Sequence, residues 1–226
     1  MKLTIIMPVL NEASGIAAAL RALAPLRARG AELIVVDGGS GDGTAEFARP
    51  LADVVLNAAR GRAAQMNAGA AAARGDVLLF LHADTALPEN ADHLILGGLA
   101  RSGRAWGRFD VRFDAGGPLR LVALMMNTRS RATGICTGDQ AMFVTRAAFD
   151  QAGGFPPIAL MEDVALSARL KRVSRPLCLS ARATTSGRRW RRHGFMRTIL
   201  LMWRLRIAFF FGRDPVTLAR RYGYAP

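Results

Sequence analysis

Two aliphatic segments of the chain lead directly into an acidic residue, and this feature constrains the fold more than any other. IVVD ends at Asp37, and VLLFLHAD ends at Asp84. Aliphatic runs of this length are typical of parallel strands that are buried on both faces. Open α/β sheets bind their ligands beyond the carboxyl ends of such strands. We therefore expect both carboxylates at a ligand-binding edge, where each can hold a ribose or a metal ion.

Strand-like and helix-like segments alternate along the chain, which predicts a sheet built from βα units. In the first half we expect strands at residues 3–9, 33–36, 54–56 and 76–81, and helices at residues 12–28, 43–49 and 62–74. In the second half we expect strands at residues 106–113 and 141–145, and helices at residues 92–101, 119–131 and 162–170. The second half is less regular than the first, so the sequence predicts a mixed α/β sheet flanked by helices.

The composition is that of one domain with a strongly basic surface. The 226 residues are 51% hydrophobic, which suffices for a full core, and the formal net charge is +14. A charge of this size favours phosphorylated ligands, an anionic lipid surface or nucleic acid as partners. The chain carries no helix-turn-helix, zinc-finger or RNP-type pattern. A basic nucleic-acid-binding module is therefore a remote alternative, and we expect no nucleic-acid partner.

Cysteine usage and the first segment of the chain point to the cytoplasm. Cys136 and Cys178 lie far apart and form no CxxC motif, which indicates buried thiols rather than a zinc site or a disulfide. The apolar run at the amino terminus meets Pro8 too soon for a signal peptide. We therefore expect a cytoplasmic protein.

Four motifs follow one another in an order that resembles family 2 glycosyltransferases with the GT-A fold. They are PVLNE at residues 8–12, VVDGGSGDGT at 35–44, GRAAQMNAGAAAARGDVLLFLHADT at 61–85, and GGF at 153–155 followed by EDVALSARL at 162–170. The resemblance covers roughly residues 1–175. It implies a GT-A-like, Rossmann-related domain over residues 1–185 that transfers a sugar from a nucleoside diphosphate sugar, with inversion, to an acceptor hydroxyl. The same resemblance favours a uridine nucleotide.

The first two motifs would hold the nucleotide. Asp37 at a strand end can accept hydrogen bonds from a base or ribose, and Gly39 lets the backbone pass close to a ligand. The loop that contains Pro8, Asn11 and Glu12 would line the same pocket, and the resemblance makes Glu12 and Asp37 nucleotide contacts. A tight strand-to-helix turn and a helix-cap role for Glu12 are the structural alternatives.

A third group of residues is suited to the diphosphate. Arg60, Arg62 and Gln65 lie where a helix is expected to begin, and the free N–H groups and positive dipole of a helix start favour phosphate. The alternative is that these arginines are solvated and bind nothing.

The resemblance also implies a divalent cation, Mn²⁺ or Mg²⁺, held at an Asp-x-Asp motif. In this chain Asp84 is the second Asp of that motif, and His82 replaces the first. An imidazole ligand suits manganese better than magnesium. His82 as a packed histidine is the alternative, and His193 is a further candidate ligand with the same alternative.

The acidic pair at residues 162 and 163 is the candidate for catalysis. Both residues lie in the first turn of an expected helix, whose dipole favours their ionised form. An ionised carboxylate that reaches an acceptor hydroxyl can take its proton. The family's base maps to Asp163, and Glu162 would support the acceptor or orient the base. Asp139 is expected to face the donor sugar or the acceptor, or to be a turn residue.

Residues 186–226 form a basic, apolar extension. Its Arg189-Trp190 pair resembles the end of the Gln-x-x-Arg-Trp motif of processive family 2 synthases, where that motif helps to hold the diphosphate and terminal sugar of the donor. Ser186 stands at the Gln position, which argues against processivity. The resemblance makes Arg189 and Trp190 candidate donor contacts.

The apolar run at residues 195–211 predicts a helix that does not cross a membrane. Arg197, Arg204 and Arg206 interrupt the run, and charges at such positions make a membrane span costly. The helix is expected either to lie on an anionic membrane at the cytoplasmic face, which would favour a lipid-linked acceptor, or to pack on the domain or in a homodimer.

Two other functions from different classes are alternatives. A non-catalytic, nucleotide-sugar-binding relative is the main alternative, because His82 replaces a carboxylate. A dinucleotide-dependent oxidoreductase is disfavoured, because Thr44 stands where the third glycine of its fingerprint belongs.

Overall fold

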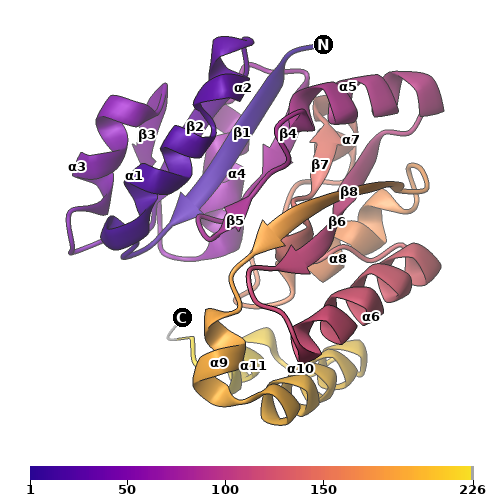
Figure 1. Ribbon diagram of the computed structural model, residues 1–226. Helices are drawn as coiled ribbons and strands as arrows, with labels where there is room; N and C mark the ends of the chain where they lie inside the picture. The colour runs from indigo at the N-terminus through magenta and orange to yellow at the C-terminus, as the bar shows by residue number, and fades with distance from the viewer. Residues whose placement is uncertain (225–226) are drawn as a thin grey trace.

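A mixed sheet forms the centre of the molecule (Figure 1). The computed structural model describes residues 1–224, except for the side chain of residue 193. Within these residues the strands are β1 (Leu3–Val9), β2 (Glu32–Asp37), β3 (Val54–Asn57), β4 (Val77–Phe80), β5 (Thr85–Ala86), β6 (Trp106–Phe113), β7 (Phe143–Thr145) and β8 (Leu177–Thr185). They are ordered β3-β2-β1-β4-β7-β6-β8-β5. The expected mixed α/β sheet flanked by helices is thus confirmed.

The first half of the sheet is parallel and deeply buried. β1 pairs in parallel with β2 and β4, and β2 pairs in parallel with β3. Every residue of β1, β2 and β4 is buried, as the uninterrupted aliphatic runs predicted. Val9 is in register with Asp37, so the first two strands end together at one edge of the sheet.

The second half of the sheet is antiparallel at β7. This strand runs antiparallel to both β4 and β6, whereas β6 and β8 are parallel with a shift in register between Phe109 and Asp110. β6 has the predicted bounds. β8 was not predicted, because its sequence LCLSARATT mixes polar and apolar residues and most of its residues are only partly buried. It completes the sheet by pairing with β5.

Helices cover both faces of the sheet. Within the described residues they are α1 (Ala13–Ala22), α2 (Ala24–Ala28), α3 (Thr44–Ala48), α4 (Arg62–Ala72), α5 (Ala91–Ser102), α6 (Pro118–Thr133), α7 (Arg146–Gln151), α8 (Glu162–Leu170), α9 (Arg188–His193), α10 (Phe195–Phe210) and α11 (Pro215–Tyr222), with 3₁₀ turns at Arg49–Leu51 and Gly138–Gln140. Side chains of α1, α2, α3 and α5 pack with one face of the strands. Those of α4, α7 and α8 pack with the other face.

The helix expected at residues 12–28 is two helices. α1 ends at Ala22 and α2 begins at Ala24, with Pro25 in the first turn of α2. A proline ring inside a helix removes one hydrogen bond and clashes with the preceding turn, whereas the first turn tolerates it. The expectation of one helix was wrong because Pro25 was read as part of its interior.

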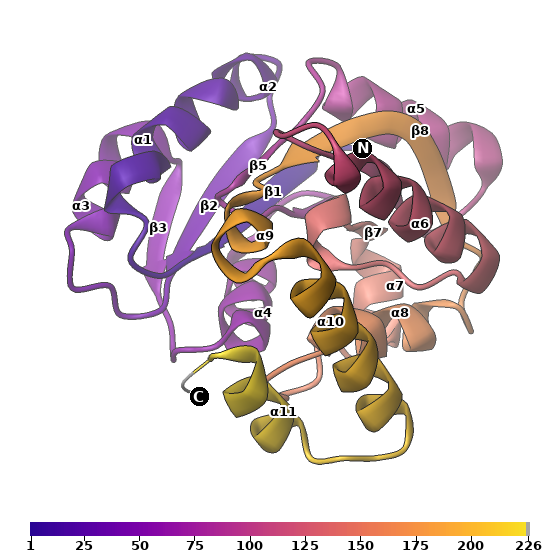
Figure 2. The same cartoon turned by 60° about the horizontal axis from the view of Figure 1, so that its bottom comes forward.

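The last three helices form a layer beyond the carboxyl ends of the parallel strands, and Figure 2 shows them on the near side. α10 was expected, whereas α9 and α11 were not. Leu205 of α10 and Leu218 of α11 form a small buried cluster with Leu160 and Met161, which precede α8. Among the described residues, no helix is long and apolar enough to cross a membrane.

Candidate active site

A cavity of about 1100 Å³ lies between the carboxyl ends of the strands and the last three helices. It is lined by the loop after β1, the start of α4, the segment after β4, the start of α8, and parts of α6, α9 and α10. The predicted site residues that line it are Pro8, Asn11, Glu12, Arg60, Arg62, Gln65, His82, Asp84, Asp139, Glu162, Asp163, Arg189 and Trp190. Asp37 and Gly39 lie outside this lining. The structure thus brings most of the predicted residues together.

Asp37 holds the turn that follows β2. Its buried carboxylate accepts hydrogen bonds from the backbone N–H of Ser40, at 3.0 and 3.2 Å, and from the Ser40 hydroxyl. The Ser40 hydroxyl in turn accepts a hydrogen bond from the N–H of Asn11, at 2.8 Å. Gly39 has a φ of 87°, a left-handed conformation that glycine adopts without strain. Asp37 therefore shapes the loop beside the cavity.

Gln65 and Asn11 tie the first two loops together. The Gln65 side-chain amide donates hydrogen bonds of 2.8 Å to the carbonyls of Val9 and Val36. The Asn11 side-chain oxygen accepts a hydrogen bond from the N–H of Gly41 at 3.0 Å. The buried Gln65 amide is therefore engaged by the backbone, and the exposed Asn11 is held at the rim.

Glu12 and Arg62 are charged residues that line the cavity beside these loops. Burial raises the pKa of Glu12, and its carboxylate lies 3.9 Å from the guanidinium of Arg188 on α9. The Arg62 guanidinium lies over the Tyr224 ring, 5.1 Å from its centroid. Although burial disfavours its charge, nearby Tyr224 and Glu162 raise the pKa of Arg62. Arg62 therefore remains a cation in the cavity, whereas Arg60 is exposed at its edge.

Four carboxylates face the same space. Burial and, secondly, the charge of Asp84 raise the pKa of Asp139 to about 6. Burial and then Asp163 raise the pKa of Glu162. The Asp163 carboxylate accepts hydrogen bonds from the N–H of Gly138, at 2.8 Å, and of Val164, at 2.7 Å, which orient it. The Asp163 carboxylate is therefore held in one orientation, next to a Glu162 that burial tends to keep protonated.

His82 is packed and neutral. Burial, helped by Arg62, lowers its pKa to about 3. Its ring lies against Gly138, where an added Cβ would come within 2.1 Å of the ring. The Nδ1 atom is 3.9 Å from the carboxylate of Asp139.

The donor set nevertheless suits a hard cation that also binds a ligand. Among the described side chains, no group of three His, Cys, Asp or Glu residues is arranged to hold a metal ion, and the side chain of His193 is outside those described. Asp84 and Asp139 both line the cavity, and the charge of Asp84 contributes to the raised pKa of Asp139. A cation between them would relieve this repulsion, and Mg²⁺ is commonly bound by one or two carboxylates together with phosphate oxygens. These two carboxylates therefore fit such an ion.

Arg189 and Trp190 are held by neighbouring aromatic residues. The Arg189 guanidinium stacks on the Tyr222 ring, 3.6 Å from its centroid, and donates a hydrogen bond to the Tyr222 carbonyl at 2.6 Å. The Trp190 ring packs against Phe113 and Phe195. These contacts fasten α9 to α11, α10 and β6, and they leave Arg188 and Arg192 exposed at the cavity.

Sequence reasoning missed two arginines of the cavity. Arg129 on α6 and Arg206 on α10 line it, and both have buried guanidinium nitrogens. From the sequence, Arg206 is identified only as a charge that interrupts an apolar helix. No local motif marks either residue, because α6 and α10 meet at the cavity only in the folded chain.

Comparison with known proteins gives one family. The model of Glycosyl transferase family 2 matches residues 4–151. No curated protein sequence gives a significant match.

Solved structures share the fold at low sequence identity. TarS of S. aureus matches with a TM-score of 0.68 and 19% identity, over 82% of this chain and 37% of TarS, and TarS 1-349 in complex with UDP-GlcNAc is covered to 58%. The mannosyltransferase PcManGT from Pyrobaculum calidifontis, in complex with GDP-Man and Mn²⁺, matches with a TM-score of 0.65 and 22% identity. The match covers 99% of this chain and 65% of PcManGT. Mannosyl-3-phosphoglycerate synthase from Rubrobacter xylanophilus matches with a TM-score of 0.61 and 18% identity, over 94% of this chain and 75% of the synthase. The chain thus spans little more than a third of TarS.

Proposed function

The chain belongs to glycosyl transferase family 2, and we propose on this premise that it transfers a sugar from a nucleoside diphosphate sugar to an acceptor hydroxyl, with inversion. One observation carries the proposal. A single cavity contains the loop after β1, the Asp84 and Asp139 carboxylates, and the oriented carboxylate of Asp163. Binding a diphosphate and deprotonating a hydroxyl are the two tasks that such a transfer requires.

The donor would lie along the loops after β1 and β2. The nucleoside would rest on the rim formed by Pro8, Asn11 and Glu12, and the diphosphate would face Arg62 and Arg188. Guanidinium groups bind phosphate oxygens through paired hydrogen bonds, which supports this orientation. A uridine nucleotide remains our proposal, and the similar structures were solved with UDP-GlcNAc in one case and GDP-Man in another.

Asp84 and Asp139 would hold a divalent cation, Mn²⁺ or Mg²⁺. When bound, the cation would neutralise charge on the diphosphate. His82 would contribute a neutral surface that packs against Gly138 and keeps the Asp139 loop in place. PcManGT was solved with Mn²⁺, which supports the proposal.

Asp163 would act as the base. As the acceptor oxygen attacks the anomeric carbon, its proton would pass to the Asp163 carboxylate, and the bond from that carbon to the diphosphate would break on the opposite face. The products would be the glycosylated acceptor with inverted configuration and the nucleoside diphosphate. The N–H groups of Gly138 and Val164 hold the carboxylate for this step. Glu162 would support the acceptor or orient the base.

Residues 186–226 would form an extension that covers the cavity and contacts a membrane. Large apolar side chains of α10 and the residue after it are exposed; they are Met196, Leu200, Trp203, Ile207, Phe210 and Phe211. Together with the surrounding arginines, they suit an anionic lipid surface better than water. We propose peripheral binding at the cytoplasmic face of a membrane, and a homodimer formed through α10 is the competing arrangement.

Thermal stabilisation by a panel of UDP-sugars and GDP-sugars, with and without Mn²⁺, tests the proposal. Binding to the folded state alone raises the melting temperature, so the correct donor should do so, and more with Mn²⁺ than without it. Release of the nucleoside diphosphate then distinguishes an enzyme from a non-catalytic, nucleotide-sugar-binding relative. The replacement of an Asp by His82 favours this non-catalytic alternative. If no nucleotide sugar stabilises the protein, the proposal fails.

A further inference from the structure

Two arginines in the cavity have buried donor groups with no partner. The Nε and Nη2 atoms of Arg129 and the Nε atom of Arg206 are buried, and the described residues offer them no hydrogen bond. Buried polar groups in folded proteins are almost always hydrogen-bonded. The buried Arg108 also has an unpartnered Nε atom, but Asp110 and two backbone carbonyls bind its terminal nitrogens, whereas the side chains of Arg129 and Arg206 donate no hydrogen bond to the described residues. The unpartnered pair is therefore a feature that needs a ligand.

The charges of the pair are only partly compensated. Burial and the nearby charge of Arg206 lower the pKa of Arg129 to about 10. Burial likewise lowers the pKa of Arg206, and Asp163 and Asp139 only partly oppose this. Within the described residues, neither arginine forms an ion pair. Two like charges that repel each other at the wall of a cavity form a site for an anion.

The pair lies on the acceptor side of the proposed reaction. The charge of Asp163, the proposed base, acts on both arginines and partly opposes the lowering of their pKa values. The groups that act on Glu12, by contrast, are Arg188, Asp84, Asp42 and Arg62, beside the loops that would bind the donor. α6 packs along β6, where the Asn127 side chain bonds the backbone of Val111, and Figure 2 shows α6 and α10 on the side of the molecule away from β2 and β3.

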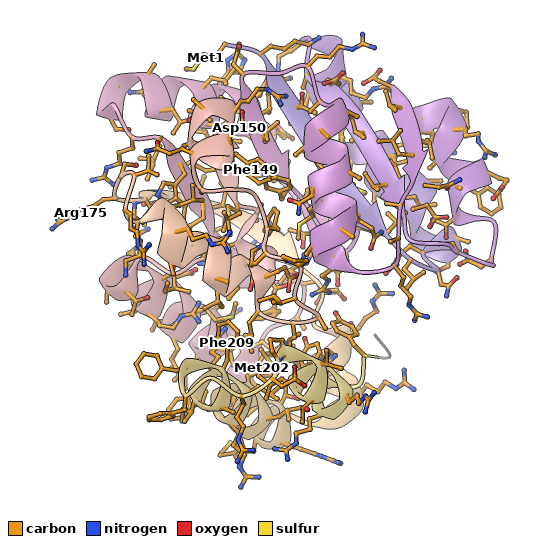
Figure 3. The ribbon with its side chains drawn as sticks, turned by 180° about the vertical axis from the view of Figure 1, so that it is seen from behind. Met1, Phe149, Asp150, Arg175, Met202 and Phe209 are labelled. Atoms are coloured by element: carbon orange, nitrogen blue, oxygen red, sulfur yellow. The ribbon has the colours of Figure 1, made fainter. Side chains whose placement is uncertain are left out.

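We infer that Arg129 and Arg206 together bind a phosphate group of the acceptor, next to the hydroxyl that Asp163 deprotonates. This inference rests on the proposed function. Two guanidinium groups offer paired N–H donors that match phosphate oxygens. Apolar side chains from the same helices, Met125, Met126, Ile199 and Met202, continue the wall beside them and would contact the rest of the acceptor. Figure 3 labels Met202 in the helical layer, at the end of the molecule opposite to Met1.

Titration calorimetry with inorganic phosphate tests the pair. The full-length protein is compared with R129Q, R206Q and the double variant. R120Q on α6 and R204Q on α10 are matched controls, because these arginines are exposed on the same helices and do not line the cavity. The double variant should bind phosphate at least tenfold more weakly than wild type, whereas each control should stay within twofold. R188Q should also retain this phosphate binding.

Parallel titrations with UDP and GDP separate this inference from the proposed function. The nucleotide that wild type binds should bind the double variant within twofold. Equal phosphate affinity in wild type and the double variant would overturn the inference, and so would a parallel loss of nucleotide, since the pair would then belong to the donor site. If wild type binds phosphate through the pair but binds no nucleotide, the anion site stands and the transferase proposal fails.

The melting temperature without ligand distinguishes a binding role from a structural one. A buried charge without a partner destabilises the fold, so R129Q and R129M should melt at or above the wild-type temperature. Met keeps the apolar stem, and Gln keeps some polarity. If both variants instead melt several degrees below wild type, Arg129 holds the structure together and the inference is wrong.

A series of alkyl phosphates identifies the source of the phosphate. If the acceptor is a lipid, the affinity for the alkyl phosphate should rise by roughly twofold to fourfold with each added methylene, because Met125 and Met202 would bury that methylene. If the acceptor is soluble, affinity should stay flat along the series. Either result supports the anion site, provided that the binding is lost in the double variant.

Discussion

The two walls of the cavity are built in opposite ways. On the wall formed by the loop after β1 and the start of α4, which the loop after β2 supports from outside the lining, polar side chains are bonded to the protein itself: Asp37 to Ser40, Asn11 to Gly41, and Gln65 to two carbonyls. On α6 and α10, the buried nitrogens of Arg129 and Arg206 have no bonding partner among the described residues. One wall is therefore complete without a ligand, and the other is complete only with one.

The difference separates stability from function. Groups that are satisfied within the protein stabilise the fold, and their removal should be felt first in unfolding. Groups that are unsatisfied cost stability, and their removal should be felt first in binding. Substitutions on the two walls should therefore give effects of different kinds.

The largest effect is expected at Asp163, where the walls meet. Asp163→Asn keeps the shape but removes the proton acceptor, so turnover should fall by about 10²-fold or more while nucleotide affinity stays nearly unchanged. Glu162→Gln should have a smaller effect, because the raised pKa of Glu162 already favours its neutral form. Release of nucleoside diphosphate is the measurement. Wild-type turnover in Asp163→Asn would place the base elsewhere.

Gln65→Leu should destabilise the wall whose polar side chains are bonded within the protein. It leaves the carbonyls of Val9 and Val36 buried without their side-chain donor, which should lower the free energy of unfolding by about 2–3 kcal/mol. Urea unfolding measures this change. Gln151→Leu, at an exposed position at the end of α7, is the control and should change stability by less than about 0.5 kcal/mol. Equal effects in the two variants would contradict the assignment.

Removing exposed aromatic residues of the helical layer should weaken membrane binding without loss of stability. The triple variant W203S/F210S/F211S should bind vesicles that contain anionic lipid at least tenfold more weakly than wild type. Vesicle sedimentation at low salt is the measurement. Phe47→Ser is the control, because Phe47 is about as exposed as Trp203 but lies on α3. If wild type does not sediment with these vesicles, α10 is a packing or dimer helix.

The smallest expected effect is in the pH dependence of stability. A carboxylate at the cavity, Asp139, and one beside β3, Asp53, should act on stability with opposite sign. The folded-state pKa of Asp139 is raised to about 6, so its contribution is present below about pH 4 and is lost as the pH rises to 6. The pKa of Asp53, beside β3, is lowered first by its hydrogen bond to Arg27, so its contribution is present above about pH 4 and is lost as the pH falls further.

Melting temperatures measured from pH 3 to pH 8 check these signs. Asp139→Asn should remove a fall of about 2–4 °C between pH 4 and 6, and Asp53→Asn should remove a loss of stability below pH 4. Mn²⁺ should reduce the fall in wild type by favouring the ionised carboxylate of Asp139. An unchanged pH profile in Asp139→Asn would show that this carboxylate is solvated.

Most of the fold could be predicted because its signals are local. The aliphatic run of β1 and the alternation of β6 gave their observed bounds. β8 could not be predicted, since its mixed sequence becomes a strand only by pairing with β6. The family resemblance was borne out by the match to residues 4–151.

The candidate site could be predicted in its members but not in their contacts. The strand-end rule placed Asp84 at the cavity, yet the same rule did not reveal that Asp37 turns toward Ser40. Which carboxylate faces a ligand and which faces its own loop depends on a turn of three residues. Arg129 and Arg206 could not be predicted, because their shared property is a missing partner, which only the folded chain can reveal.

The contact between His82 and Gly138 has an evolutionary consequence. The imidazole occupies the space that any side chain at position 138 would need. A change of residue 138 alone is therefore blocked, and a change of residue 82 to aspartate would open a void next to the Asp139 loop. Positions 82 and 138 should consequently have exchanged residues as a pair during the divergence of this lineage, with a larger residue at 138 tolerated only where 82 is small.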